Sequence, residues 1–499
     1  MSFKYLLHRR IFVPLAILVL AVGGTAWQEG GNSCAAEADG ARQWRHIDQS
    51  RYVGSKKCAE CHQEHYNGWK DTGHNKMIRP PITEVPGQTV LADFTQISPH
   101  RTFELKDVKW VIGHRWKQRF IGEIDGQEVV LPAQWSVQEK TWQSYSGKSD
   151  WWYPDHQDWT QRSNFKLCAG CHSTGTEPLT ESWTEQNIAC ERCHGPGKAH
   201  AENAALDNIV NPARLPRDRS IEICLSCHLA GKPPGTDFAW AVGYEAGMEL
   251  SEFWKGFEPE EEKETAEFWR NGTARKNRVQ GNTFLQSVMY HAGLQCTACH
   301  NPHGTRYRSL TIKSADDNAL CLTCHGPEKD IGPDYGTLTD HTHHVPTSVG
   351  SRCVECHMAK TGTNSVAGES RNHTFAFISP ADTIKSGVPN SCNGCHADKS
   401  PEWALSELQK WSKEAEGKTG STAAVSEVRA KTRRERRNSN DELFIDQHDS
   451  RSQGVRLGLW TKANAGTEFA GLRATGIASR VRVDWDDSCH ILVLRRSTR

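Results

Sequence analysis

Eight copies of one five-residue pattern dominate this chain. The pattern is Cys-x-x-Cys-His, and it uses 16 of the 18 cysteines among 499 residues. At this composition chance would supply on the order of 0.03 such matches, so the repetition reflects a chemical requirement. The copies are CAECH at 58–62, CAGCH at 168–172, CERCH at 190–194, CLSCH at 224–228, CTACH at 296–300, CLTCH at 321–325, CVECH at 353–357 and CNGCH at 392–396.

The spacing within each copy suits covalent attachment of haem. Two thiols three residues apart add across the two vinyl groups of one haem, and the adjacent imidazole binds the iron axially. The chain is therefore predicted to carry eight covalent haem c groups. The predicted attachment residues are Cys58, Cys61, Cys168, Cys171, Cys190, Cys193, Cys224, Cys227, Cys296, Cys299, Cys321, Cys324, Cys353, Cys356, Cys392 and Cys395. The predicted proximal ligands are His62, His172, His194, His228, His300, His325, His357 and His396.

Zinc binding and disulfide formation are the alternative uses of these cysteines. Zinc sites combine cysteine pairs with varied partners and do not require a histidine directly after every second cysteine. Disulfides that staple loops require neither the fixed spacing nor the histidine. Haem attachment therefore explains the regularity best, and Cys34 and Cys489, which lie outside the pattern, are expected to be bystanders.

Composition indicates what fills the interior. Only 36% of the residues are hydrophobic and the mean hydropathy is -0.66, so aliphatic side chains are too few for several ordinary cores. Porphyrin faces are expected to take their place. The intervals between motif histidines are 110, 22, 34, 72, 25, 32 and 39 residues, which brings neighbouring haems close together. The predicted fold is mainly α with little regular secondary structure, organised around covalently bound haems.

The 110-residue interval predicts a small β-hairpin insertion between the first and second motifs. Apolar residues alternate on both sides of Asp125-Gly126, a pair typical of a two-residue hairpin turn. The insertion is expected to cover about residues 93–160 of an octahaem cytochrome c domain that spans 50–411. Residues 412–499 lack the motif and form a tail of uncertain structure, to which no chemistry is assigned.

The first residues predict export. A basic start is followed by the apolar run 11–22, as in a signal peptide covering residues 1–26, with 27–49 as a linker. The alternative is a retained anchor, but this run is shorter than the roughly 20 residues that a spanning helix needs. The mature chain is therefore expected to be periplasmic or otherwise extracytoplasmic, and not membrane-spanning after signal removal.

Residues from about 52 to 411 resemble multihaem cytochromes of the cytochrome c-552/c-554 family, including members with doubled CXXCH motifs. The resembling phrases include YVGSKKCAECHQEHYNGWKDTGHNKM, NFKLCAGCHSTG, IACERCHGPGKAH, QGNTFLQSVMYHAGLQCTACHNPHG and RNHTFAF. Sixteen histidines lie outside the motifs, enough to give every iron a second imidazole. The family phrases suggest as distal ligands His74, His200, His291, His303, His343, His344 and His373, together with His341 of DHTHH.

The resemblance implies electron transfer, and it keeps an enzymatic alternative open. Wider relatives include octahaem oxidoreductases that act on nitrite, hydroxylamine or tetrathionate. Pentahaem nitrite reductases replace the histidine of the catalytic motif with lysine, whereas all eight motifs here end in histidine, which favours an electron carrier. The expected partners are redox proteins, either other cytochromes or quinol-linked membrane complexes. Equal numbers of basic and acidic residues, 60 each, give no indication of nucleic-acid binding.

Mass spectrometry can test the predicted number of haems. The chain, matured in a host competent for cytochrome c assembly, should carry eight haem additions, roughly 4.9 kDa in total, and lack the signal peptide. Replacing Cys171 or Cys193 with Ala should leave one haem held by a single thioether, or lost. Recovery of zinc without haem would contradict the prediction.

Overall fold

The computed structural model describes residues 44–85, 87–145, 162–276, 280–326, 337–362 and 371–419, and three strands between 468 and 497. The predicted signal peptide 1–26 and most of the predicted linker 27–49 lie outside the described residues. Two compact units divide the chain. One unit comprises Ala41–Asn440 with Gln447–Asp449, and it contains all eight motifs. The other comprises Met1–Gly40, Asp441–Asp446 and Ser450–Arg499.

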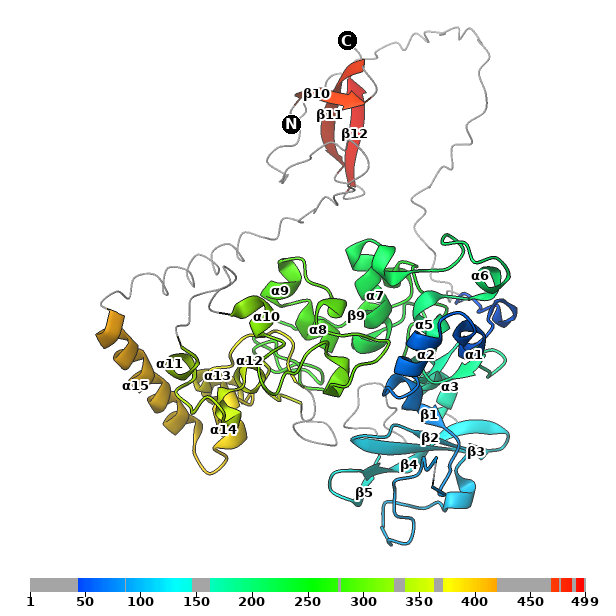
Figure 1. Cartoon of the computed structure of the whole chain (residues 1–499), viewed down its shortest axis with the longest axis horizontal. Coiled ribbons are helices and arrows are strands. Elements are labelled where there is room, and N and C mark those ends of the chain that lie inside the picture. Colours follow the sequence, from blue (N-terminus) through cyan, green and yellow to red (C-terminus); the bar gives the residue numbers. More distant parts are fainter. Residues whose placement is uncertain are drawn as a thin grey trace, which may run out of the picture. The chain divides into compact units, whose positions relative to one another are not determined.

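A five-stranded antiparallel sheet lies between the first and second motifs (Figure 1). Its strands follow chain order: β1 (Ile78–Arg79), β2 (Trp110–Ile112), β3 (Lys117–Ile124), β4 (Gln127–Ser136) and β5 (Thr141–Ser144). The predicted turn is confirmed, since Ile124 pairs with Gln127 across it. Asp125 and Gly126 have φ of 51° and 80°, the left-handed pair whose twist matches that of the flanking strands.

Aromatic packing gives this sheet a core of its own. Phe120 is fully buried, and its ring contacts Phe94, Phe103 and Trp142 at centroid distances of 5.3 to 5.7 Å. Trp135 packs edge-on against Trp142 at 5.4 Å. The alternation that predicted a hairpin therefore places one face of the sheet in a conventional hydrophobic core.

Short helices and turns carry the motifs. The α-helices are α1 (Ser55–Ala59), α2 (Gln63–Trp69), α3 (Asn164–Leu167), α4 (Ala169–His172), α5 (Cys190–His194), α6 (Lys198–Glu202), α7 (Arg217–His228), α8 (Gln280–Phe284), α9 (Val288–His291), α10 (Leu322–His325), α11 (Leu338–Thr342), α12 (Cys353–His357), α13 (Pro380–Ser386), α14 (Ser391–Cys395) and α15 (Pro401–Thr419). The 3-10 turns are η1 (Gln49–Arg51), η2 (His74–Lys76), η3 (Leu105–Asp107), η5 (Pro212–Arg214), η6 (Leu250–Glu252), η7 (Cys296–Ala298), η8 (Arg308–Leu310) and η9 (Val349–Ser351). A single helical turn is enough to bring cysteines three apart onto one face.

The predicted mainly α fold is wrong. The fold is only 34% helical, and the insertion is a five-stranded sheet rather than a small hairpin. Most motifs lie in short helical segments, and most helices span only four to seven residues. The sheet also gains β1, which pairs with β2 through Ile78 and Ile112. A two-residue strand has too little pattern to be recognised in a sequence.

Two minor two-stranded pairings and a separate sheet complete the architecture. The pairs join β6 (Ser173–Thr174) to β7 (Glu185–Gln186) and β8 (Gly231–Lys232) to β9 (Lys255–Gly256). The other unit contains the antiparallel strands β10 (Glu468–Ala474), β11 (Ile477–Asp486) and β12 (Ile491–Ser497). Helix α15 continues past residue 411, where the tail was predicted to begin. Among the described residues, no helix combines the length and apolarity needed to cross a membrane.

Candidate functional site

Five motif histidines each face a histidine from another segment of the chain, and His62 also has His65 of its own segment at 6.4 Å. Two imidazoles bound to one iron have ring centres about 6 Å apart, because each metal–nitrogen bond is about 2 Å and each nitrogen lies about 1 Å from its ring centre. The observed separations all match that span. They are 6.3 Å for His62 and His200, 6.0 Å for His194 and His303, 6.4 Å for His228 and His74, 6.1 Å for His357 and His341, and 6.4 Å for His396 and His344.

Backbone carbonyls fix the orientation of many of these imidazoles. A ligating histidine usually donates its second ring N–H to such an acceptor, which directs the other nitrogen to the metal. Here the Nδ1 of His194 lies 2.8 Å from the carbonyl of Val210, and that of His300 lies 2.8 Å from the carbonyl of Ser309. The same contact occurs for His357 with Phe375, His200 with Ala205, His373 with Arg371 and His344 with Thr342. Their Nε2 atoms remain available to a metal.

His373 and His74 lie in the region between the motifs at 224–228 and 296–300. Both imidazoles are close enough to His228 and His300 to interact with them electrostatically. Burial lowers the pKa of His373 to about 4, and burial likewise lowers the pKa of His74 to about 4. Both rings are therefore neutral near pH 7, the form that binds iron.

Direct contacts between cysteines show which motifs are neighbours. Contact with the thiol of Cys190 raises the pKa of Cys58, and the same contact lowers the pKa of Cys190 to about 7. Equivalent contacts join Cys224 to Cys296 and Cys321 to Cys353. Weaker electrostatic interactions link Cys193 with Cys227, Cys299 with Cys324 and Cys356 with Cys392. Seven motifs therefore follow one another without a gap, from 58–62 through 190–194 to 392–396.

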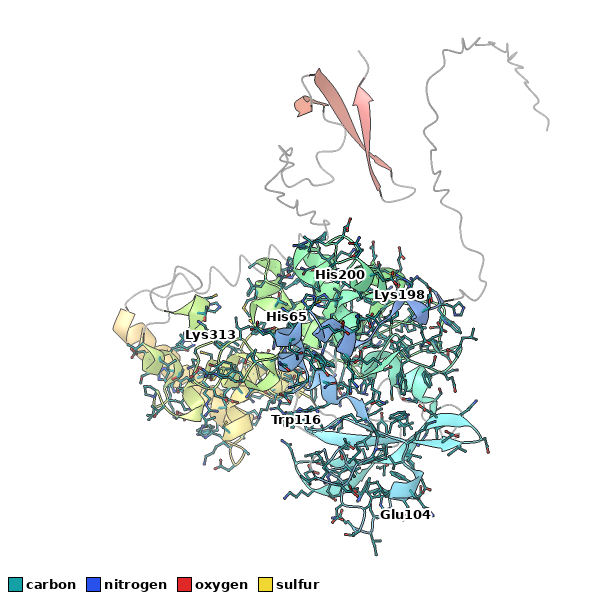
Figure 2. All side chains as sticks on the ribbon, turned by 45° about the vertical axis from the view of Figure 1, so that its right-hand side comes forward. His65, Glu104, Trp116, Lys198, His200 and Lys313 are labelled. Atoms are coloured by element: carbon teal, nitrogen blue, oxygen red, sulfur yellow. The ribbon has the colours of Figure 1, made fainter. Side chains whose placement is uncertain are left out.

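Glu191, inside the motif at 190–194, ties that motif to its neighbours. Its buried carboxylate accepts hydrogen bonds from the backbone N–H groups of Val53 at 3.0 Å, Gly54 at 2.8 Å and Gly197 at 2.7 Å. The first two amides precede the motif at 58–62, and Gly197 begins the turn that leads to His200. His65 and His200 both interact electrostatically with His194, and Figure 2 labels the first two of these residues.

Comparisons with known proteins agree with this geometry. The sequence profile of the family "Cytochrome c554 and c-prime" matches residues 57–89 and 133–195, and that of the "Doubled CXXCH motif" matches residues 290–330. The multiheme cytochrome MtrA of Shewanella baltica (strain OS185) is 23% identical over 256 residues, which cover 47% of this chain and 72% of MtrA. The crystal structure of the outer cell wall cytochrome OcwA has a TM-score of 0.59 at 20% identity, covering 78% of this chain and 92% of OcwA.

This chain is a multihaem c-type cytochrome. Its cofactor is therefore covalently bound haem c, and the resemblance found in the sequence is confirmed. Among the described residues, none of the sixteen motif cysteines forms a disulfide, so their sulfur atoms are not committed to one another. The zinc and disulfide alternatives are set aside.

The structure places His343 and His291, which the sequence also predicted as ligands, against aromatic side chains. The ring of His343 stacks on Trp411, with centroids 4.3 Å apart and planes 7° from parallel, rather than facing a motif histidine. His291 is exposed, and its ring contacts Tyr290 at 5.4 Å. Sequence reasoning did not single out His65, which stacks on His303 at 4.4 Å. Its only sequence signal is its position three residues after His62.

Tight packing distinguishes Gly170 from Gly394, although both occupy the second variable position of their motifs. A Cβ at residue 170 would lie 1.9 Å from the indole of Trp240, whereas a Cβ at residue 394 would meet nothing within 4 Å. Gly170 thus allows the motif at 168–172 to pack directly on Trp240.

We expect Gly170→Ala to cost the cytochrome one haem. The overlap should destabilise this region by about 3 kcal/mol or more, because the ring or the motif must move. Mass spectrometry of the matured protein should then show a major species about 0.6 kDa lighter than the fully loaded cytochrome. Gly394→Ala is the matched control and should keep the full haem complement. Equal haem content and equal thermal stability in the two variants would contradict this interpretation.

Proposed function

We propose that this cytochrome is an extracytoplasmic octahaem electron carrier. The single observation that carries the proposal is the set of imidazole pairs 6.0 to 6.4 Å apart, because a pair with this separation can hold a six-coordinate iron. An iron with two imidazole ligands exchanges electrons and has no open position for a substrate. Eight motifs supply eight attachment sites.

The proposed proximal ligands are the eight motif histidines, and five distal ligands follow from the ring separations. In this assignment His200 completes the site of His62, His303 that of His194, His74 that of His228, His341 that of His357, and His344 that of His396. For His300 we propose His373 as the distal ligand. Burial and proximity to His300 support this assignment, as does the hydrogen bond between its Nδ1 and the carbonyl of Arg371.

The order of the cysteine contacts suggests the path of the electrons. Bound haem supplies one-electron transfer, and the chain holds the attachment points close enough for successive transfers. The described contacts connect the motif at 58–62 to that at 190–194 and continue through 224–228, 296–300, 321–325 and 353–357 to 392–396. We propose that electrons pass between the two ends of this series.

The cellular location and the partners are inferred from the sequence and from a relative. The predicted signal peptide at residues 1–26 indicates export, and the name of OcwA places that relative in the outer cell wall. We propose that this cytochrome also works outside the cytoplasm and exchanges electrons with other redox proteins, such as cytochromes or quinol-linked membrane complexes.

The ligand assignment predicts different results for two histidines that were equally plausible in the sequence. His373→Ala should convert one low-spin haem into a high-spin form that binds carbon monoxide, because the iron loses its distal imidazole. His343→Ala should leave the spin state of every haem as it is in the unchanged protein, since His343 packs on Trp411. Electron paramagnetic resonance and carbon monoxide difference spectra of the two variants can test this. The assignment fails if His373→Ala keeps the spectra unchanged, or if His343→Ala generates the high-spin signal.

Electron delivery can be compared directly with catalysis. The fully reduced protein, mixed anaerobically with an excess of an oxidised small cytochrome c, should deliver about eight electrons per chain, one for each haem. Nitrite, hydroxylamine and tetrathionate should reoxidise it more slowly than the cytochrome. Sustained consumption of one of these oxyanions or amines, with little transfer to the cytochrome, would instead identify an oxidoreductase.

A further inference from the structure

We propose that Arg192 is a half-buried cation that raises the reduction potentials of the two haems attached at 168–172 and 224–228. This inference rests on the proposed attachment of haem at those motifs. In this proposal Arg192 makes reduction of the haem more favourable at one place along the series. Arg192 is not a ligand, and it occupies the second variable position of the motif CERCH at 190–194.

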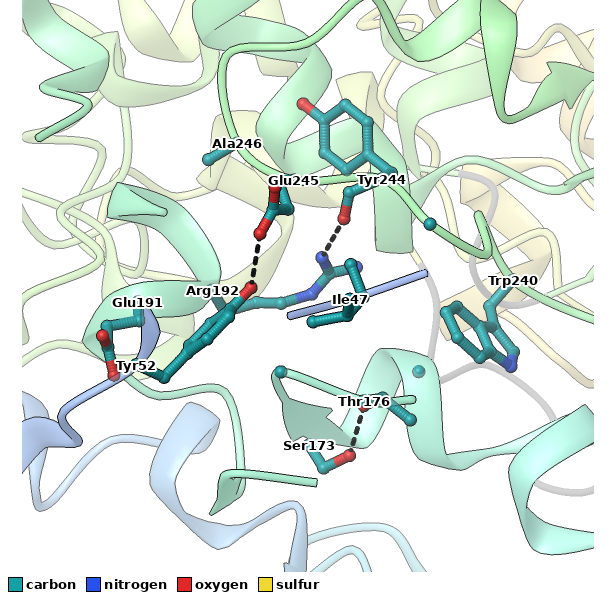
Figure 3. A pocket seen from close by; sticks show the side chains of 13 residues that line it. Ile47, Tyr52, Ser173, Thr176, Glu191, Arg192, Trp240, Tyr244, Glu245 and Ala246 are labelled. Carbon is teal, nitrogen blue, oxygen red and sulfur yellow. Dashed lines mark hydrogen bonds between the residues drawn. The ribbon is translucent and has the colours of Figure 1, made fainter. Parts of the chain in front are cut away.

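The guanidinium of Arg192 lies where three motifs meet. Its Nη2 is 3.7 Å from Sγ of Cys227, and it also interacts electrostatically with Cys171. Its Nη1 donates a hydrogen bond of 3.4 Å to the carbonyl oxygen of Tyr244 (Figure 3). One arginine on the motif at 190–194 thus approaches the attachment cysteines of two other motifs.

Nearby carboxylates are committed to other partners. Glu191 binds three backbone N–H groups, as described above, and Glu245 accepts hydrogen bonds from Tyr52 and from Arg45 and Arg51. Within the part of the chain that the structure describes, Arg192 forms no ion pair, and its buried Nε atom makes no hydrogen bond. Its positive charge is therefore not neutralised by a protein carboxylate.

Solvent near the guanidinium is limited as well. Arg192, Tyr52, Tyr244, Glu245 and Trp240 line a cavity of about 20 Å³, which has room for about one water molecule (Figure 3). A charge in such surroundings acts over a longer range than one exposed to bulk water. Haem attachment would convert Cys171, Cys193 and Cys227 into uncharged thioethers, so none of these nearby sulfur atoms would balance the charge.

Reduction changes the charge of a haem, so a nearby cation affects its reduction potential. A haem that accepts an electron gains one negative charge, so a nearby half-buried cation stabilises the reduced form and raises the potential. The two haems beside Arg192 should therefore hold electrons more tightly than they would without it. Electrons that enter the series should accumulate at this junction.

Redox titration of Arg192→Gln tests the proposal. With haem absorbance and electron paramagnetic resonance as readouts, two haems should titrate at lower potential than in the unchanged protein. Arg192→Lys keeps the charge and should restore most of the shift. Arg219→Gln is the matched control, because Arg219 precedes the motif at 224–228 but pairs with Glu222 and Glu249 near the surface, and its titration should not change.

The outcomes separate this proposal from the proposed function. Mass spectrometry first establishes whether Arg192→Gln carries the full haem complement. If haem is absent from these motifs in the unchanged protein, the proposed function fails. If all haems are present and low-spin in Arg192→Gln but no potential falls, the role of Arg192 is refuted. The role is also refuted if Arg192→Lys shifts the potentials as far as Arg192→Gln does.

Discussion

The approach of distant histidines to the motif histidines is the contact on which the arrangement of the motif-bearing unit depends. A motif places one histidine beside its own cysteines, and in five close pairs the second histidine comes from another segment. Three of the five pairs join residues more than 100 positions apart in the sequence: His62 with His200, His194 with His303, and His228 with His74. The chain must therefore return repeatedly over earlier motifs. Short helices separated by loops satisfy this requirement, whereas long helices would carry the chain away.

Two different kinds of interior coexist in this unit. The five-stranded sheet is held by aromatic and β-branched side chains around Phe120, as in an ordinary globular domain. The region after residue 290 differs, because its buried hydrophobic residues are few among those described, namely Val354, Ala359, Ile378, Val388 and Ala404. Covalent haem explains how such a region can be stable, since porphyrin faces supply the apolar surface that its side chains lack.

The variable positions of the motif distinguish one site from another. The cysteines and the histidine repeat in every copy of the motif, while the residues between them contact different surroundings. In CERCH, Glu191 holds the backbone around Gly54 and Gly197, and Arg192 reaches Cys227. In CAGCH, Gly170 permits contact with Trp240. A single haem chemistry can thus be adjusted locally without altering the residues that attach it.

Sequence alone was sufficient for features that depend on neighbours in the chain. It identified a multihaem c-type cytochrome and predicted the Asp125-Gly126 turn, because the repeated motif and the turn each involve residues at most a few positions apart. It misjudged the helical content and the size of the sheet, and it could not separate His341 and His344 from His343 within DHTHH. The different positions of these three histidines depend on contacts with Trp411, His357 and His396. These residues lie up to 70 positions away in the sequence and meet the DHTHH segment only in the folded chain. Contact between distant segments, not local pattern, decided which imidazoles can share an iron.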